Sequence, residues 1–116
     1  MAELNNFGAV FTFAIGMEQQ IRDYYAAQNL DDEADASSKR IEKLERARRE
    51  YVVEITLEPI DDLHSDDFVI NTDDPSEAGR AAIEATAKRF YTTAAPKINV
   101  RQAQRILERC GKQYNG

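Results

Sequence analysis

The chain has few residues that could form a disulfide or offer nitrogen or sulfur to a metal ion. Of its 116 residues, one is cysteine, one is histidine and none is tryptophan. The single Cys110 excludes a disulfide within the chain, which is typical of a reducing compartment. Residues 1–6 contain no basic segment, so we expect no signal peptide and a cytoplasmic protein. The apolar stretch from Phe7 to Met17 is too short to cross a bilayer.

Basic residues are also in the minority. The sequence has 15 lysines and arginines against 21 acidic residues, a net charge of −6. Binding to nucleic acid or to anionic lipid needs a concentrated positive face, so we expect neither nucleic acid nor a membrane as a partner. The sequence contains no Ser/His/Asp set, no Cys/His pair and no glycine-rich phosphate loop. It therefore favours a protein that is not an enzyme.

Prolines and turn residues divide the chain into four stretches with helical spacing of apolar residues. We expect helices over about 4–28, 35–58, 75–95 and 100–114. Asp74 is the predicted N-cap of the third helix, with Pro75 in its first turn and Glu77 at the capping-box position. Asn99 is the predicted N-cap of the fourth.

The four helices predict a single all-α domain over residues 1–116. The apolar stripes consist of Phe7, Phe11, Ala14, Ile21 and Tyr25; Ile41, Leu44, Tyr51 and Ile55; Ile83, Ala87, Phe90, Tyr91 and Ala94; and Val100, Ala103, Ile106, Leu107, Cys110 and Tyr114. Residues 59–74 form the one long connection, and its apolar run, residues 68–70, is expected to pack against the bundle. Extended, the connection reaches roughly 50 Å, longer than a helix of ~23 residues. We therefore expect a four-helix bundle of two helical hairpins joined by a long crossover.

The two halves of the sequence resemble each other. In the first helix, Glu18 lies seven residues before Tyr25, and in the third helix Glu84 lies seven residues before Tyr91. The second and fourth helices share the pattern Leu-Glu-Arg-x-x-basic-Glu/Gln-Tyr, which covers residues 44–51 and 107–114. Two helices that match in the same order indicate a duplicated helical hairpin.

This repeat resembles the ferritin-like superfamily, and within it the rubrerythrin type. In that family a glutamate lies about seven residues before an aromatic pair on helices one and three, and helices two and four carry Leu-x-x-x-Glu-x-x-His. The resemblance implies a four-helix bundle in which these six side chains hold two iron ions. Glu18 and Glu84 stand at the positions of the lone glutamates.

The sequence departs from the family pattern at the other four positions. Arg48 and Gly111 replace the glutamates of helices two and four, and Tyr51 and Tyr114 replace the histidines. The only histidine, His64, lies in the acidic connection, which we interpret as a solvated loop. Two carboxylates without further donors make a poor di-iron site, so we expect no cofactor.

A buried glutamate needs a partner, and Arg48 on the second stripe is the predicted one. We expect Arg48 to bridge Glu18 and Glu84 where the family holds metal; alternatively, the second helix is rotated and Arg48 reaches solvent. The tyrosines on the inner stripes are expected to donate to the glutamates. Gly111 makes room either for Arg48 or for close helix packing, or it marks the frayed end of the helix. Cys110 is a small core residue. The predicted polar core cluster consists of Glu18, Arg48, Tyr51, Glu84 and Tyr114.

Three functions are compatible with this interpretation. The first is a non-catalytic module that acts by self-association or by binding a protein, with an Arg48–Glu18–Glu84 ion-pair core. The fourth helix is short, so part of the core is expected to be exposed at one end, where a homodimer would cover it. The second is a divergent metal-binding protein or oxidoreductase in which Glu18 and Glu84 bind iron or manganese with tyrosine, Cys110 or a partner's ligands. The third is a small-molecule binder that uses the former metal cavity.

Overall fold

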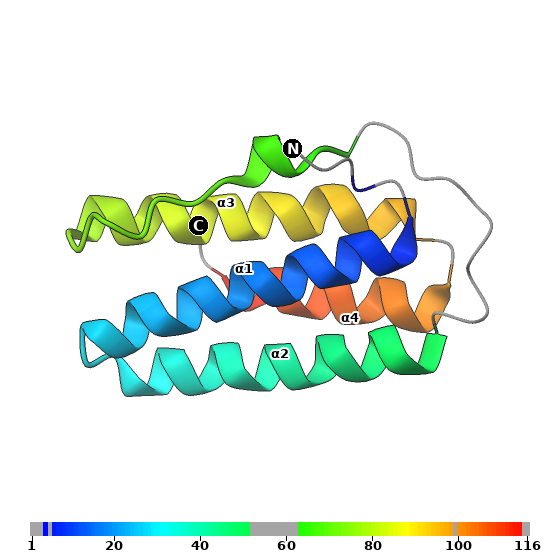
Figure 1. The fold of residues 1–116 in the computed structure, drawn as a ribbon, viewed down its shortest axis with the longest axis horizontal. Coiled ribbons are helices and arrows are strands. Elements are labelled where there is room, and N and C mark those ends of the chain that lie inside the picture. Colours follow the sequence, from blue (N-terminus) through cyan, green and yellow to red (C-terminus); the bar gives the residue numbers. More distant parts are fainter. Residues whose placement is uncertain (1–3, 5, 52–62, 99, 115–116) are drawn as a thin grey trace.

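The structure, a computed structural model, describes residue 4 and residues 6–51, 63–98 and 100–114, and only the backbone of Tyr51. It contains four α-helices: α1 (Phe7–Ala27), α2 (Asp31–Tyr51), α3 (Glu77–Ala94) and α4 (Arg101–Lys112). Two short 3-10 helices, η1 (Ser65–Phe68) and η2 (Ala95–Lys97), precede α3 and α4. The described residues form no β-sheet, and the prediction of an all-α four-helix bundle is confirmed (Figure 1).

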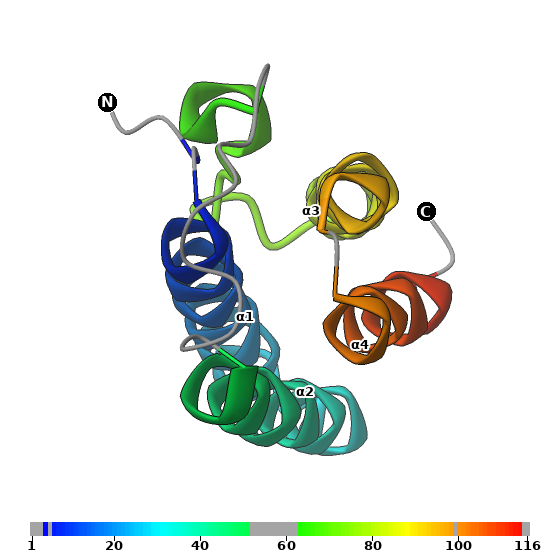
Figure 2. The same ribbon diagram turned by 90° about the vertical axis from the view of Figure 1, so that its right-hand side faces the viewer.

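The helices are arranged as two antiparallel pairs. α1 contacts α2 and α3, and α4 contacts the same two helices, so α1 and α4 lie on opposite corners of the bundle (Figure 2). α2 and α3 run in the same direction, and residues 63–76 run along the outside of the bundle towards the end where α3 begins (Figure 1). The predicted end of the second helix at Glu58 and the first part of the predicted crossover lie outside the described residues. No helix in the described part of the chain combines the length and apolar character that crossing a bilayer requires.

The turn between α1 and α2 is shorter than predicted. α1 begins after Asn6, whose side chain accepts a hydrogen bond from the amide of Ala9 at 2.8 Å. It ends at Ala27, and Asn29 follows with φ 62°, the left-handed conformation that commonly terminates helices. α2 then begins at Asp31 instead of at residue 35, because acidic residues in a first turn interact favourably with the helix dipole. The predicted loop over residues 31–34 was wrong.

The start of α3 differs from the prediction by two residues. Ser76, and not Asp74, is the N-cap: its hydroxyl accepts from the amide of Gly79 at 3.1 Å. The Asp74 carboxylate accepts instead from the amide of Ser76 at 3.0 Å, in the segment just before the helix. The predicted cap of the fourth helix, Asn99, lies outside the described residues.

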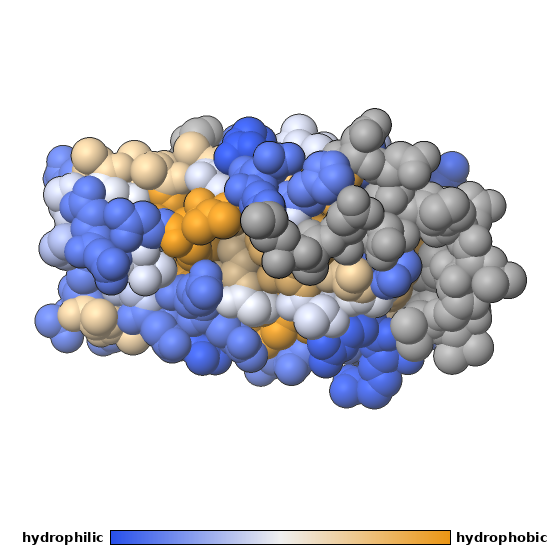
Figure 3. All heavy atoms as spheres, turned by 45° about the horizontal axis from the view of Figure 1, so that its top comes forward, coloured by the Kyte–Doolittle hydropathy of each residue, from blue (hydrophilic) through white to orange (hydrophobic). Residues whose placement is uncertain are grey.

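The core follows the predicted stripes. All the residues predicted for the stripes of α1 and α3 are buried, as are Ile41 and Leu44 of α2. In the segment before α3, Phe68 is buried and its ring lies 5.2 Å from that of Phe90, which confirms that this segment packs on the bundle. Val69 is the one large hydrophobic residue exposed in the described part of the chain, at 73%. Figure 3 shows this side of the bundle as mainly hydrophilic, with a small hydrophobic patch.

Gly111 permits close packing between α4 and α3. A Cβ atom at this position would lie 2.9 Å from the Cβ of the buried Tyr91, closer than such atoms approach in proteins. Close helix packing, one of the three explanations for Gly111, is therefore confirmed. At Gly16 of α1, by contrast, a Cβ would meet nothing within 4 Å.

These two glycines predict opposite effects of substitution by alanine. We expect Gly16→Ala to raise the free energy of unfolding by up to about 1 kcal/mol, the gain in helix propensity. We expect Gly111→Ala to lower it by about 1–3 kcal/mol, because the clash with Tyr91 outweighs that gain. Denaturant unfolding of the two variants measures both, and a stabilised Gly111→Ala variant would contradict the close packing.

Candidate functional site

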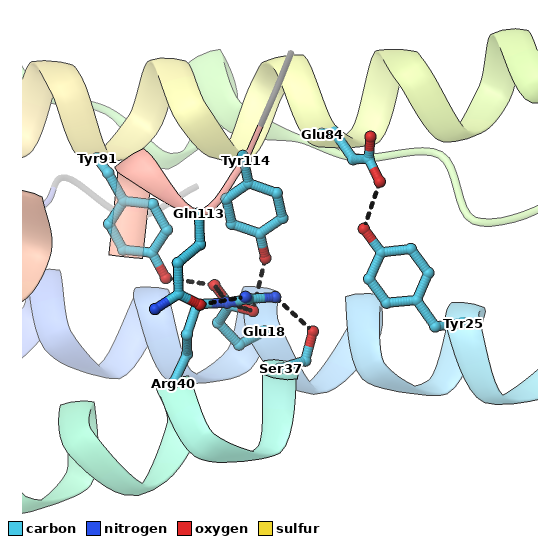
Figure 4. A network of polar contacts seen from close by, with 8 residues as sticks. All are labelled: Glu18, Tyr25, Ser37, Arg40, Glu84, Tyr91, Gln113 and Tyr114. Carbon is cyan, nitrogen blue, oxygen red and sulfur yellow. Dashed lines mark hydrogen bonds and ion pairs between the residues drawn. The ribbon is translucent and has the colours of Figure 1, made fainter. Parts of the chain in front are cut away.

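The centre of the bundle contains a fully buried carboxylate. Glu18 of α1 has 0% exposure, as predicted from its place on the apolar stripe. Its Oε1 accepts a hydrogen bond from the Tyr114 hydroxyl at 2.7 Å, and its Oε2 accepts one from the Tyr91 hydroxyl at 2.6 Å. Arg40 Nε lies 3.0 Å from both oxygens (Figure 4). Three side chains from other parts of the bundle therefore surround this carboxylate.

Arg40 is the buried cation of the site. It is 3% exposed, and its guanidinium stacks 4.4 Å above the ring of Tyr114. Nη1 donates to Gln113 Oε1 at 2.8 Å, and Nη2 donates to the Ser37 hydroxyl at 2.7 Å. Burial by itself lowers the pKa of Arg40, but the Glu18 carboxylate outweighs it and holds that pKa above its usual value. Arg40 therefore stays protonated under all ordinary conditions.

A second and more exposed cluster lies nearer the α1–α2 turn. Glu84 of α3, whose side chain is 20% exposed, accepts from the Tyr25 hydroxyl at 2.6 Å and from Arg80 Nε at 3.0 Å. Arg80 also donates to Glu33 of α2 at 3.4 Å, and its guanidinium lies 5.5 Å from the centre of the Tyr25 ring. The second cluster therefore repeats the elements of the first, namely a glutamate, an arginine and a tyrosine.

The two clusters are joined by an exchange between the halves of the repeat. Glu18 of the first half accepts from Tyr91 of the second, and Glu84 of the second half accepts from Tyr25 of the first (Figure 4). The exchange follows from the antiparallel packing of α1 on α3, which places each glutamate level with the tyrosine seven residues beyond the other. The prediction that inner tyrosines donate to these two glutamates is confirmed for the three whose side chains are described, Tyr25, Tyr91 and Tyr114.

The structure corrects the predicted role of Arg48. Arg48 is half-buried and donates to the hydroxyl of Thr12 at 3.3 Å, away from both glutamates. Arg40, eight residues earlier on α2, pairs with Glu18 instead. Glu18 and Glu84 are not bridged by a shared arginine, because Arg80 provides the cation of Glu84. The side chain of Tyr51, the remaining member of the predicted cluster, lies outside the described residues.

The error has an identifiable cause in the register of the α1–α2 hairpin. Glu18 lies eleven residues before Asn29, and Arg40 lies eleven residues after it, so a tight turn at Asn29 places the two side chains level. Arg48 was predicted from its place on the stripe of Ile41 and Leu44 and at a family ligand position, without counting how far it lies from the turn. Eight helical residues correspond to about 12 Å along the axis. Arg40 also lies within the predicted helix, so counting residues from the turn would have distinguished it from Arg48.

The donors around Glu18 do not fit a di-iron centre. The carboxylate offers about four lone-pair positions, and two tyrosine hydroxyls and a guanidinium shared by both oxygens occupy them. A cation next to Arg40 would also be repelled by it. Within the described residues, no three or more His, Cys, Asp or Glu side chains are grouped as a metal ion would require.

The thiol of Cys110 is not an activated nucleophile. It is 1% exposed, and burial, followed by the nearby Glu18, raises its pKa to about 12. A thiol with such a pKa stays protonated at neutral pH, and the thiolate is the reactive form. Cys110 is thus a small core residue, as its place on the α4 stripe predicted.

Comparison with models of protein families, with curated proteins and with solved structures gives no match. The interpretation of the site therefore depends on the chain's own residues and contacts. The likeness to rubrerythrins stays a resemblance of spacing, at Glu18, Tyr25, Glu84 and Tyr91.

Two arginines of α2 provide a matched test of the buried pair. We expect Arg40→Ala to lower the free energy of unfolding by about 3–5 kcal/mol, because it leaves Glu18 buried without a cation. We expect Arg48→Ala to cost only about 0.5 kcal/mol, as for a surface change. Replacing both members, with Glu18→Met and Arg40→Met, should recover most of the loss because no unpaired charge is then buried. Denaturant unfolding measures the free energy of unfolding of each variant. Equal losses of stability for Arg40→Ala and Arg48→Ala would contradict the pairing of Arg40 with Glu18.

The three hydrogen-bonded tyrosines predict a loss of stability in alkali. Burial, and then the adjacent glutamate, raise the pKa of Tyr25, Tyr91 and Tyr114 above the usual value of 10.0. The folded state therefore holds these protons more tightly than the unfolded state. Their contribution to stability is complete below pH ~10 and declines as the pH rises further.

The measurement is a titration of tyrosinate absorbance alongside helical circular dichroism. Of the five tyrosines in the sequence, these three should ionise only as the helix signal is lost, in one cooperative transition above pH ~10. In denaturant, all five should titrate together near pH ~10 as the control. Ionisation of all five near that pH with the helices intact would refute the hydrogen bonds.

Proposed function

We propose that the chain is a non-catalytic four-helix module with a structural ion-pair core, which acts through its surface by self-association. The observation that supports this proposal is the surroundings of Glu18. Its carboxylate is buried and accepts from Arg40, Tyr91 and Tyr114. Each of these groups donates a hydrogen bond to the carboxylate. The lone pairs of Glu18 are therefore directed at these three groups and not at a substrate or a metal ion.

The buried pair serves the fold by fixing the relative positions of the helices. Breaking a buried ion pair is strongly destabilising, so alternative registers that separate Glu18 from Arg40 are disfavoured. A catalytic carboxylate, by contrast, has to reach the reacting atoms. Glu18, at 0% exposure, lies behind Arg40 and the two tyrosines.

The support for self-association comes from an apolar surface beside η1 and not from the end that α4 leaves uncovered. α4 spans 12 residues against 21 for α1 and α2, so it covers only part of the bundle. The uncovered end was expected to expose apolar core, but in the described residues it is lined by charged and polar side chains. The apolar surface lies instead beside η1, where Val69 is exposed next to the partly buried Phe13 and Ile70. We propose this surface as the contact between two copies.

One experiment tests the core and the association together. Metal content by mass spectrometry and molecular mass by light scattering are measured on protein purified without chelator. We expect iron and manganese well below one equivalent, the mass of a dimer for the natural chain, and the mass of a monomer for Val69→Asp.

The outcomes separate the proposal from its main competitor. Stoichiometric iron or manganese that is lost in Glu18→Ala and Glu84→Ala would show a divergent metalloprotein and refute the structural core. A monomer for the natural chain, or a dimer that Val69→Asp leaves intact, would refute the proposed contact. Arg49→Asp, an exposed change of charge on α2, serves as the control for Val69→Asp.

A further inference from the structure

The end of the bundle that α4 does not reach contains a polar cavity. α4 stops at Lys112, and beyond it α1, α2 and α3 enclose a cavity of about 230 Å³. The side chains that line it are mainly ionised or polar, and they include Tyr25, Glu33, Arg40, Arg80, Glu84 and Gln113. Drug-sized ligands occupy pockets of ≈ 300–1,000 Å³. A cavity of this smaller size suits a ligand of only a few heavy atoms.

The charges of the cavity are distributed unevenly along it. On the side nearer the centre, Arg40 is balanced by Glu18. On the other side, Arg80 lies between Glu84 at 3.0 Å and Glu33 at 3.4 Å, so carboxylates outnumber cations by one. Figure 4 shows the Arg40 group and Glu84 separated along the bundle. The cavity therefore has a neutral side with a guanidinium and a side with a net negative charge.

The neutral side has hydrogen-bond donors to offer. A guanidinium has five N–H groups, and in the described residues Arg40 uses one on Nε, one on Nη1 and one on Nη2. One hydrogen on each Nη is left for a further acceptor. Gln113 accepts from Arg40 through Oε1 and holds this edge of the guanidinium in place.

We propose that this cavity binds a small zwitterion of the amino-acid class. The ligand's carboxylate accepts from Arg40, and its ammonium group lies with Glu33 and Glu84. An anion without an ammonium group would leave the extra negative charge beside Arg80 without a cation. An amine without a carboxylate would leave the remaining N–H groups of Arg40 without an acceptor. The inference goes beyond the proposed function, because neither a structural core nor self-association requires a ligand.

The test is a titration of the full chain followed by ¹H–¹⁵N NMR. The probes are glycine, β-alanine and γ-aminobutyrate, which differ in the distance between their two charges, together with butyrate and butylamine, which each lack one charge. We expect at least one zwitterion to shift the amide resonances of residues around the cavity, with a dissociation constant at least about tenfold below those of butyrate and butylamine. Saturation by no zwitterion, or equal affinity for butyrate or butylamine, would overturn the proposal.

A matched pair of variants in the first turn of α2 tests the site directly. Glu33 contacts Arg80 and lines the cavity, whereas Asp32 is exposed and does not line it. We expect Glu33→Gln to weaken binding about fivefold, because one carboxylate facing the ammonium group is lost. Asp32→Asn removes the same charge from the same turn and should leave the affinity unchanged. Equal effects of the two substitutions, or none from Glu33→Gln while the helix signal is intact, would refute the assignment.

Discussion

The structure depends on one buried carboxylate that all four helical segments reach. Glu18 belongs to α1, Arg40 to α2 and Tyr91 to α3, and Tyr114 lies two residues beyond α4. An ionised carboxylate taken out of water without compensation costs far more than a small domain's total stability. Closing the bundle therefore brings these three donors together on Glu18, and the loss of any one of them destabilises it. Apolar packing tolerates small slips between helices. The ion pair does not, so it makes folding depend on the correct helix register.

The fold and much of the polar core could be predicted from the sequence. The apolar stripes of α1 and α3, the burial of Glu18, and the donation from Tyr25, Tyr91 and Tyr114 to the two glutamates follow from spacing and from the rule that buried polar groups find partners. The identity of the cation could not be predicted, because it depends on the position of a turn. Asp31 and its acidic neighbours resemble a loop, yet they form the first turn of α2. The stripe and the family position pointed to Arg48, whereas the tight turn at Asn29 places Arg40 level with Glu18.

The two glutamate clusters differ in how closed they are. Glu18 has 0% exposure and a partner at every lone pair, whereas the side chain of Glu84 is 20% exposed and borders a cavity. The difference follows from α4, whose last residues bring Tyr114 onto Glu18 but leave the space beside Glu84 unfilled. The same glutamate, arginine and tyrosine elements thus form a structural centre in one place and the wall of an open cavity in the other.

Charge balance explains why the likeness to rubrerythrins does not extend to their metal centre. Two iron ions need several carboxylates around them, and at the corresponding positions this chain has Arg48, Gly111, Tyr51 and Tyr114. The one buried carboxylate is already neutralised by one guanidinium, so an added divalent ion would bring positive charge that no described group compensates. Removing Arg40 alone would not restore a metal site, because a single buried glutamate with two phenol donors is still short of ligands. The spacing of the repeat is therefore compatible with two different solutions for a polar core, and in this chain the donors present favour the ion pair.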